Sequence, residues 1–154
     1  MACSGLHPRV GIFSIINDEQ GRVLIGRRLS TLGKGHWGFP GGHLEQGEDF
    51  FHCVERETLE ETGLRIRATK VVGLTNDIFP ELNKHYVTVF TTCERVDPCQ
   101  QPQRLEIEKC EGWVWKTWQE IESMAKGECG NEELFLPVRN LVRENPQLRA
   151  SLDS

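Results

Sequence analysis

The amino-acid sequence predicts one domain of the α/β type in the broad sense, an α+β fold whose mixed β-sheet lies between α-helices. A length of 154 residues is ordinary for one domain. Short apolar runs are interspersed with helical patterns, and the first two runs are separated by a polar turn instead of a helix. A G-x-G-x-x-G spacing occurs at residues 33–38 (GKGHWG), but it leads into an extended run and not into a helix, so a Rossmann domain is not favoured. We assign residues 1–8 to an N-terminal tail and residues 9–154 to the single domain.

Short apolar runs bounded by turn residues predict the strands. These runs lie at residues 10–16, 23–28, 37–39, 70–74, 86–93 and 112–116. The polar residues 17–21 predict a tight turn, which makes the first two strands a hairpin. The run at 37–39 is short because Pro40 pushes the residue before it toward extended geometry, and Gly41-Gly42 then predicts a break in regular structure.

Residues 49–62 predict a helix. Asp49 can cap its start, the interior lacks glycine and proline, and Gly63 stands where a C-terminal cap belongs. Apolar and small residues recur at helical spacing and predict a stripe that faces the core: Phe50, Phe51, Val54 and Thr58. Two further helices are expected at residues 117–125 and about 132–143.

Composition excludes several classes of protein. The longest strongly apolar run has seven residues, against the ~20 that a membrane-spanning helix needs, and the N-terminus lacks the apolar core of a secretory signal. We therefore expect a cytoplasmic protein with no membrane partner. Its six cysteines are irregularly spaced, which favours free thiols. A net charge of −5 argues against a nucleic-acid polymer as a partner.

Acidic residues are concentrated in one segment, residues 45–61, which holds seven carboxylates and one cation, Arg56. Within it, Glu57, Glu60 and Glu61 stand at i, i+3 and i+4 of the predicted helix, which places the three side chains on one face within ~5–6 Å of one another. Oxygen ligands of this kind are those that Mg²⁺ and Mn²⁺ prefer. Such a trio alone is more typical of a solvated helix face, so the surrounding pattern has to decide.

That pattern resembles the Nudix box, G-x5-E-x7-R-E-U-x-E-E-x-G-U, where U is aliphatic. Here it reads Gly42, five residues, Glu48, seven residues, then residues 56–64 (RETLEETGL), with Thr58 at the first U as the only departure. The likeness extends over roughly residues 9–122. Residues 40–45 (PGGHLE) and 106–113 (EIEKCEGW) are similar to a MutT-like subgroup of the family. The resemblance implies the Nudix fold, with its mixed sheet sandwiched between helices.

The resemblance also implies a metal-dependent reaction. Nudix hydrolases cleave a nucleoside diphosphate linked to another group at a phosphoanhydride bond, with Mg²⁺ as the expected cofactor and Mn²⁺ as the alternative. Glu57 and Glu61 are expected to be the principal ligands, with the carbonyl of Gly41 in the metal shell and Glu60 as a further ligand or water activator.

Two more box residues and two outside it are given catalytic roles. Pairing of Arg56 with Glu48 would tie the loop to the helix and hold the metal-binding carboxylates in place. The general base is expected from Glu111 or Glu108. In the bacterial type member a ligand glutamate directly precedes a tryptophan, whereas here Gly112 stands in that place.

Substrate contacts are expected from the loop that opens the box and from two later segments: Gly41, Gly42, His43, Leu44, Thr88, Phe135 and Leu136. Relatives often carry tryptophan at the place of Leu136, so base stacking is expected to be weaker here. The leading hypothesis is hydrolysis of a small-molecule substrate, a nucleoside triphosphate, to the monophosphate and pyrophosphate. The alternatives are a prenyl diphosphate hydrolase and an inactive domain that binds nucleotide or a protein partner. Homodimers are common among relatives, which leaves a second copy of the chain open as a partner.

Overall fold

The computed structural model describes residues 7–152. Residues 1–6 of the predicted tail, with Cys3, lie outside the described residues. The elements are β1 (Arg9–Ile16), β2 (Arg22–Arg28), β3 (Trp37–Gly38), β4 (Gly41–His43), α1 (Phe50–Thr62), β5 (Ile66–Phe79), the 3-10 helix η1 (Pro80–Leu82), β6 (Lys84–Arg95), β7 (Cys110–Thr117), α2 (Trp118–Ala125), α3 (Leu136–Glu144) and α4 (Leu148–Leu152).

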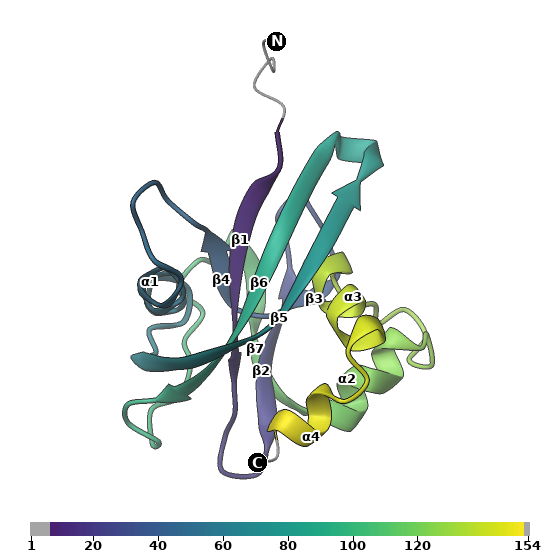
Figure 1. Cartoon of the computed structure of the whole chain (residues 1–154). Helices are drawn as coiled ribbons and strands as arrows, with labels where there is room; N and C mark the ends of the chain where they lie inside the picture. Colours follow the sequence, from purple (N-terminus) through teal and green to yellow (C-terminus); the bar gives the residue numbers. More distant parts are fainter. Residues whose placement is uncertain (1–6, 153–154) are drawn as a thin grey trace.

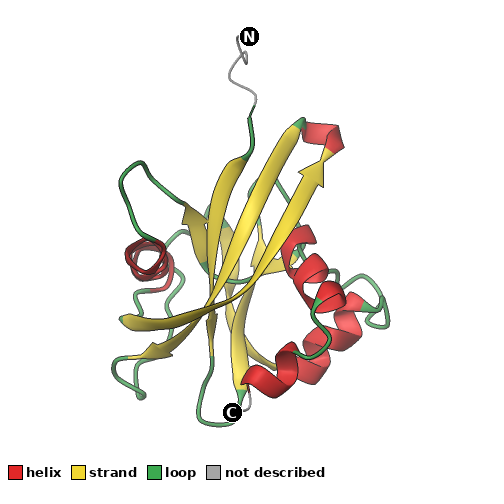
Figure 2. Cartoon of the chain, viewed as in Figure 1, coloured by secondary structure: helices red, strands yellow, loops and turns green. Residues whose placement is uncertain are grey.

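The strands form two sheets, with the orders β4-β1-β6-β5 and β3-β2-β7. Strands β1 and β6 are parallel, and every other pair is antiparallel, so the larger sheet is mixed. Helix α1 lies on one side of the sheets, whereas α2, α3 and α4 lie on the other (Figures 1 and 2). The predicted arrangement of a mixed sheet between helices is confirmed.

The first two strands are not hairpin partners, so that prediction is wrong. At the turn the two strands are joined by an isolated antiparallel bridge between Asn17 and Val23. Beyond it β1 pairs with β4 and β6, and β2 pairs with β3 and β7. Both strands are apolar and buried along most of their length, so each is central in its own sheet, and the tight turn carries the chain from one sheet to the other.

Strand β1 divides the apolar interior in two because successive side chains point to opposite faces. Phe13 and Ile15 pack in a cluster with α2 and α3, whereas Ile12 and Ile16 pack in a second cluster with α1. The Gly41-Gly42 pair does not break regular structure as predicted. It forms β4, which runs antiparallel to β1 and places the start of the Nudix-like pattern against this central strand.

Helix α1 has the predicted ends. The side chain of Asp49 accepts from the backbone N–H of the residue three positions on at 2.8 Å, and Gly63 is the C-cap. The predicted core stripe is half wrong, because Phe50 and Phe51 are 40% and 38% exposed. The buried face consists of Cys53, Val54, Thr58 and Thr62. The first turn of the helix therefore extends past the core that the rest of the helix covers.

Helix α3 begins later than predicted. Leu134 bridges to Trp37, and the N–H of Phe135 donates to the carbonyl of Trp37 at 2.8 Å, so the segment before Leu136 is extended and continues the smaller sheet. The five cysteines among the described residues are free, as expected. No helix within residues 7–152 is both long enough and apolar enough to cross a bilayer.

Candidate active site

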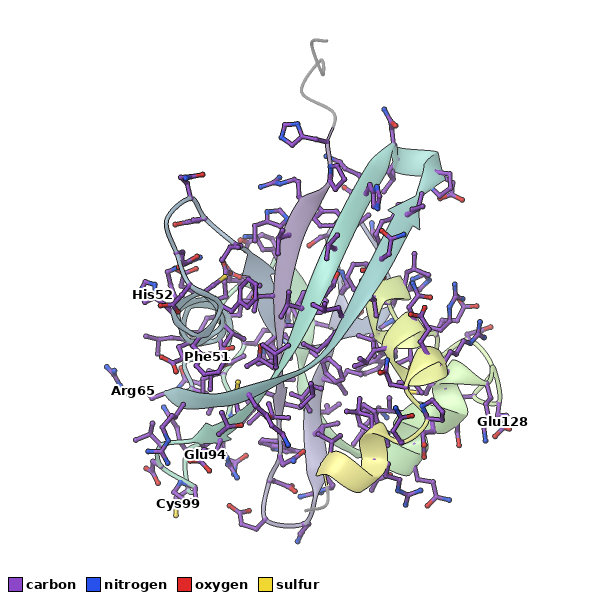
Figure 3. The ribbon with its side chains drawn as sticks, in the orientation of Figure 1. Phe51, His52, Arg65, Glu94, Cys99 and Glu128 are labelled. Atoms are coloured by element: carbon purple, nitrogen blue, oxygen red, sulfur yellow. The ribbon has the colours of Figure 1, made fainter. Side chains whose placement is uncertain are left out.

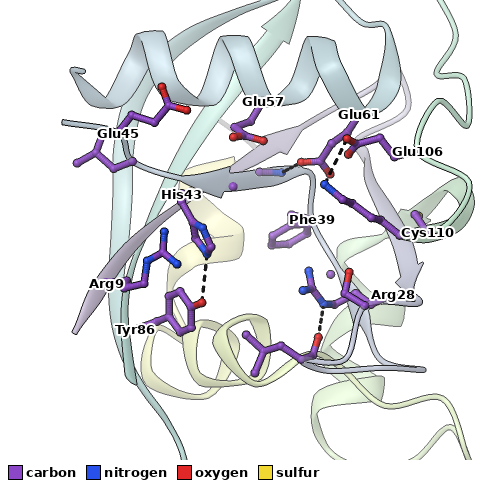
Figure 4. Close-up of a pocket in the computed structure, with 18 of the residues that line it drawn as sticks. Arg9, Arg28, Phe39, His43, Glu45, Glu57, Glu61, Tyr86, Glu106 and Cys110 are labelled. Carbon is purple, nitrogen blue, oxygen red and sulfur yellow. Dashed lines mark hydrogen bonds and ion pairs between the residues drawn. The ribbon is translucent and has the colours of Figure 1, made fainter. Parts of the chain in front are cut away.

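A cavity of about 690 Å³ opens beside α1, where β1, β2 and β4 meet the loop before β7. Figure 4 shows its two chemical sides. The carboxylates of Glu57, Glu61 and Glu106 lie along one wall, whereas Arg9 and Arg28 lie across the cavity from Glu57 and Glu61. An acidic wall that faces cations suits a ligand that carries phosphates together with a bound cation.

Glu61 is the most confined of the three carboxylates. Its Oε1 accepts a hydrogen bond from the backbone N–H of Gly41 at 3.1 Å, and the residue is partly buried where it lines the cavity. Burial raises the pKa of Glu61 well above its ordinary value, and the neighbouring Glu57 and Glu106 raise it further, against the hydrogen bond from Gly41 and the charge of Arg28. A cation at this wall would relieve that cost.

Glu57 lies one helical turn before Glu61, and its side chain is 18% exposed. Burial raises its pKa, although Arg56 donates from Nη1 to Oε1 at 2.9 Å and opposes the shift. A Cβ at Gly42 would lie 2.2 Å from Cδ of Glu57, and one at Gly41 would lie 2.1 Å from the carbonyl oxygen of Ile12. The glycine pair is therefore required for β4 to fit between β1 and the acidic side of α1.

Arg56 and Glu48 form the predicted ion pair. The Nε and Nη2 atoms of Arg56 donate to the two carboxylate oxygens of Glu48 at 2.7 and 3.0 Å. This bidentate contact, with a backbone N–H from Glu45, lowers the pKa of Glu48 to about 2, and it raises the pKa of Arg56. The loop before α1 is thereby tied to the helix through its outer side.

The basic side of the cavity has an aromatic support. The Cζ of Arg28 lies 4.0 Å from the ring centroid of Phe135, and its Nε donates to the carbonyl of Leu32 at 3.0 Å. Burial lowers the pKa of Arg28. These contacts hold a guanidinium at the edge of the cavity, where it can meet an anionic ligand.

His43 and Tyr86 form the opposite edge of the cavity. Their rings stack at 5.5 Å, and Nε2 of His43 lies 3.1 Å from the Tyr86 hydroxyl (Figure 4). Burial lowers the pKa of His43, and the positive charges of Arg9, Lys84, Arg28 and Lys109 lower it further. The surroundings of this edge are therefore electropositive.

Comparison with known proteins agrees with this geometry. Residues 5–136 match the profile of the NUDIX domain. The chain belongs to the Nudix family. A MutT protein from Methanosarcina mazei Go1 superposes with a TM-score of 0.75 and 21% identity, over 92% of this chain and 95% of that one, which shows a shared fold.

Two curated relatives carry names of hydrolytic enzymes. The m7GpppN-mRNA hydrolase NUDT17 of Xenopus laevis is 30% identical over 122 residues, which are 69% of this chain and 40% of that protein. The ADP-ribose pyrophosphatase of Methanocaldococcus jannaschii is 31% identical over 84 residues, 54% of this chain and 49% of that protein. This chain thus spans less than half the length of either relative.

The structure brings together only part of the predicted Nudix site. Glu57, Glu61 and the segment from Gly41 to Leu44 line the cavity. Glu60 does not line the cavity; its side chain is 52% exposed and lies 3.4 Å from Arg56. A helix advances about 100° per residue, so Glu60 and Glu61 cannot both face the same wall squarely.

The two candidate bases also lie outside the cavity lining. Glu111 is 49% exposed and lies 3.8 Å from Arg27, and Glu108 is exposed. Glu106 occupies the acidic wall instead. Glu106 belongs to the same MutT-like segment as Glu108. Apolar and acidic residues alternate there (LEIE), so the sequence pattern does not show which of the two glutamates faces the cavity unless the path of the loop is known.

The remaining predicted substrate residues border two other cavities. Thr88 and Phe135 line an apolar cavity of about 90 Å³ that shares Arg28 and Tyr86 with the main one, whereas Leu136 lines a cavity of about 410 Å³ elsewhere. The hydroxyl of Thr88 already donates to Asp77 at 2.6 Å. Three cations of the main cavity were missed by sequence reasoning, namely Arg9, Arg28 and Lys109, because isolated basic residues carry no spacing signal.

The oxygen donors of the acidic wall are of the kind that bind a divalent cation. Glu57 and Glu61 supply hard carboxylate oxygens, and the Gly41 backbone approaches Glu61 directly. Within residues 7–152, no three His, Cys, Asp or Glu side chains already converge as a complete ligand group. The protein therefore offers a partial set of ligands, which phosphate oxygens and water would complete, as is usual for Mg²⁺.

Proposed function

We propose that this Nudix protein is a divalent-cation-dependent hydrolase that cleaves a phosphoanhydride bond in a diphosphate-containing substrate. The observation that carries the proposal is the wall formed by Glu57 and Glu61 across the cavity from Arg9 and Arg28. Two carboxylates whose pKa values are raised by burial gain most from a bound cation, and the facing cations suit the oxygens of the substrate phosphates.

The roles of the residues follow from their positions. Glu57, Glu61 and the carbonyl of Gly41 would hold the cation, which, when bound, neutralises phosphate oxygens and lowers the pKa of a bound water. Arg28 and Arg9 orient the phosphates by charge-assisted hydrogen bonds. The Arg56–Glu48 pair fixes α1 against the loop, so that Glu57 keeps its direction.

We assign the general base to Glu106 in place of Glu111. Its carboxylate lies on the acidic wall, 3.5 Å from the Lys109 ammonium, and can take a proton from the attacking water, whereas Glu111 is turned toward Arg27 outside the cavity. A base must come within hydrogen-bond reach of the proton it accepts, directly or through one water. Placement in the cavity therefore favours Glu106.

The substrate that we favour is a nucleoside triphosphate, cleaved to the monophosphate and pyrophosphate. Arg9 and Arg28 offer two positive charges to the phosphates, and a volume of about 690 Å³ lies within the usual range for small-molecule sites. The names of both relatives denote hydrolysis of nucleotide anhydrides. A prenyl diphosphate would place an apolar tail in a cavity with charged walls, so it is the weaker candidate.

The decisive experiment is a substrate screen of the purified full chain with Mg²⁺, Mn²⁺ or chelator. Nucleoside triphosphates, nucleotide sugars, dinucleoside polyphosphates and prenyl diphosphates are compared by kcat/KM. We expect turnover to depend on the metal and kcat/KM to be highest for the nucleoside triphosphates. Near-normal turnover in both Glu57→Gln and Glu61→Gln would overturn the metal assignment, and tight nucleotide binding without phosphate release would support the inactive-domain alternative.

A further inference from the structure

A second cavity of about 470 Å³ lies where β1 begins and the β5–β6 hairpin turns. Its lining includes His7, Arg9, Lys84 and His85 together with the aromatic rings of Phe79 and Tyr86. Arg9 and Tyr86 also line the main cavity, so the two cavities share a wall. In Figure 4 Arg9 and Tyr86 lie beside His43 at that shared edge.

The second cavity is basic although the chain as a whole is acidic, with a net charge of −5. None of its lining residues is an aspartate or glutamate. Two acidic residues of the hairpin flank this lining: Glu81 lines a different cavity, and Asp77 is buried, where it accepts hydrogen bonds from Thr75, Thr88 and Asn140. Neither Arg9 nor Lys84 forms an ion pair with any residue in the described range 7–152.

Two cations without an acidic partner beside an open cavity favour an anionic ligand. Imidazole N–H groups from His7 and His85 add hydrogen-bond donors, because a histidine ring donates in either charge state. His85 is itself held by a contact of 2.5 Å between Nε2 and Oδ1 of Asn76. Phe79 and Tyr86 pack edge to face at 6.2 Å and offer an apolar surface next to the charges. This combination suits phosphate groups joined to a nucleoside.

We propose that this second cavity is a subsite for the phosphates of a further nucleotide that is covalently attached to the substrate in the main cavity. The inference rests on the proposed function and extends it, because a mononucleotide would fill the main cavity alone whereas a longer substrate reaches past Arg9 and Tyr86. The further nucleotide can belong to an oligonucleotide or to a dinucleoside polyphosphate, which carry the same phosphate chemistry.

The test measures binding apart from hydrolysis. Anisotropy or calorimetry with the full chain, in chelator, compares three probes: a nucleoside triphosphate, a dinucleoside polyphosphate, and a fluorescein-labelled tetranucleotide with a 5′-triphosphate. The variants are Lys84→Ala and His85→Ala, with Lys70→Ala as a matched control, because Lys70 is an exposed lysine of β5 outside the cavity lining. Melting curves verify that each variant folds.

We expect Lys84→Ala to weaken binding of an extended probe about 3- to 10-fold, with less than a twofold change for the mononucleotide and for Lys70→Ala. The slope of log affinity against log salt should fall by about one for the extended probe. If Lys84→Ala loses affinity only for the tetranucleotide, the subsite accepts an oligonucleotide. If it also loses affinity for the dinucleoside polyphosphate, the subsite accepts either extension. An equal loss with all probes, or no loss with either extended probe, would overturn the subsite. Failure of the proposed function would appear separately, as absence of turnover by the wild type with Mg²⁺.

Discussion

Two glutamates at opposite ends of the Nudix box show how differently the same side chain is used. Glu48 is 6% exposed, yet two hydrogen bonds from Arg56 lower its pKa to about 2. Glu61 is confined at the cavity wall, where one backbone N–H faces two neighbouring carboxylates, and its pKa is raised well above the ordinary value. Glu48 is fully compensated by the protein, whereas Glu61 requires something that the chain does not supply.

This difference separates the part of the box that stabilises the fold from the part that we propose to bind the cation. An ion pair satisfied on the outer side of α1 needs nothing further, so its loss should appear as reduced stability. A buried carboxylate without a cationic partner destabilises the folded chain. Binding of a cation would offset this cost. Removal of the Glu48 carboxylate should therefore lower the stability of the protein. Removal of the Glu61 carboxylate should raise the stability of the metal-free protein and lower its activity.

The largest effect is expected for Glu61→Gln. The turnover number should fall about 1,000-fold, the upper scale for removal of one group that stabilises transition-state charge. In chelator the variant should melt at a higher temperature than the wild type. A folded-state pKa raised above 4.5 means that the wild type loses stability as the pH rises from 4.5 through the raised value, and glutamine removes this loss.

Mg²⁺ completes this comparison. It should raise the melting temperature of the wild type and have a much smaller effect on Glu61→Gln. Glu128→Gln, at an exposed position outside the cavity lining (Figure 3), is the matched control and should behave like the wild type in both assays. An unchanged turnover number, or an equal shift with Mg²⁺ in the wild type and Glu61→Gln, would contradict the contrast between Glu48 and Glu61.

The next effect tests the choice of base at the acidic wall. Glu106→Gln should lower kcat about 100-fold, within the range of general-base catalysis, whereas Glu111→Gln should change it less than about twofold. The reverse ranking of the two variants would return the base to Glu111.

The third effect is on stability at the other end of the box. Glu48→Gln should lower the free energy of unfolding by about 1.5–3 kcal/mol, the range for hydrogen bonds to a charged group. Because the folded-state pKa of Glu48 is about 2, below the ordinary 4.5, the stabilisation is present above pH 4.5 and is lost as the pH falls toward 2. Urea unfolding across that interval should show the difference from wild type shrinking; a constant difference would disprove the linkage.

Sequence reasoning predicted the box better than its surroundings, for a physical reason. The spacing of Glu57 and Glu61 and the Arg56–Glu48 contact depend on one helix and one short loop, so periodicity and charge suffice to predict them. The placement of Glu106 depends instead on how a loop more than 40 residues away in the chain returns to α1. Local pattern contains no information on that path.

The same limit explains the errors in the fold. A short polar turn between two apolar strands is typical of a hairpin, but β1 and β2 each find two partners elsewhere, and burial on both faces outweighs the local preference. The glycine pair at 41–42 was predicted as a break from propensity alone. Its formation of β4 follows from the close approach of Ile12 and Glu57, which only the tertiary structure brings together.

The smallest effect is expected for Glu60→Gln, which tests how sharply α1 divides its two sides. Glu60 belongs to the same acidic trio as Glu57 and Glu61 in sequence, but its side chain is 52% exposed and lies 3.4 Å from Arg56 on the outer side. An exposed ion pair contributes ~0–1 kcal/mol, so both stability and kcat should change less than about fivefold when expressed as equilibrium or rate ratios. Parallel kinetics of the Gln variants at 57, 60 and 61 measure this ranking. A fall in kcat for Glu60→Gln as large as that for Glu61→Gln would mean that the Glu60 side chain enters the cavity when substrate and cation bind. The division between a stabilising side and a ligand-binding side of α1 would then apply only to the free protein.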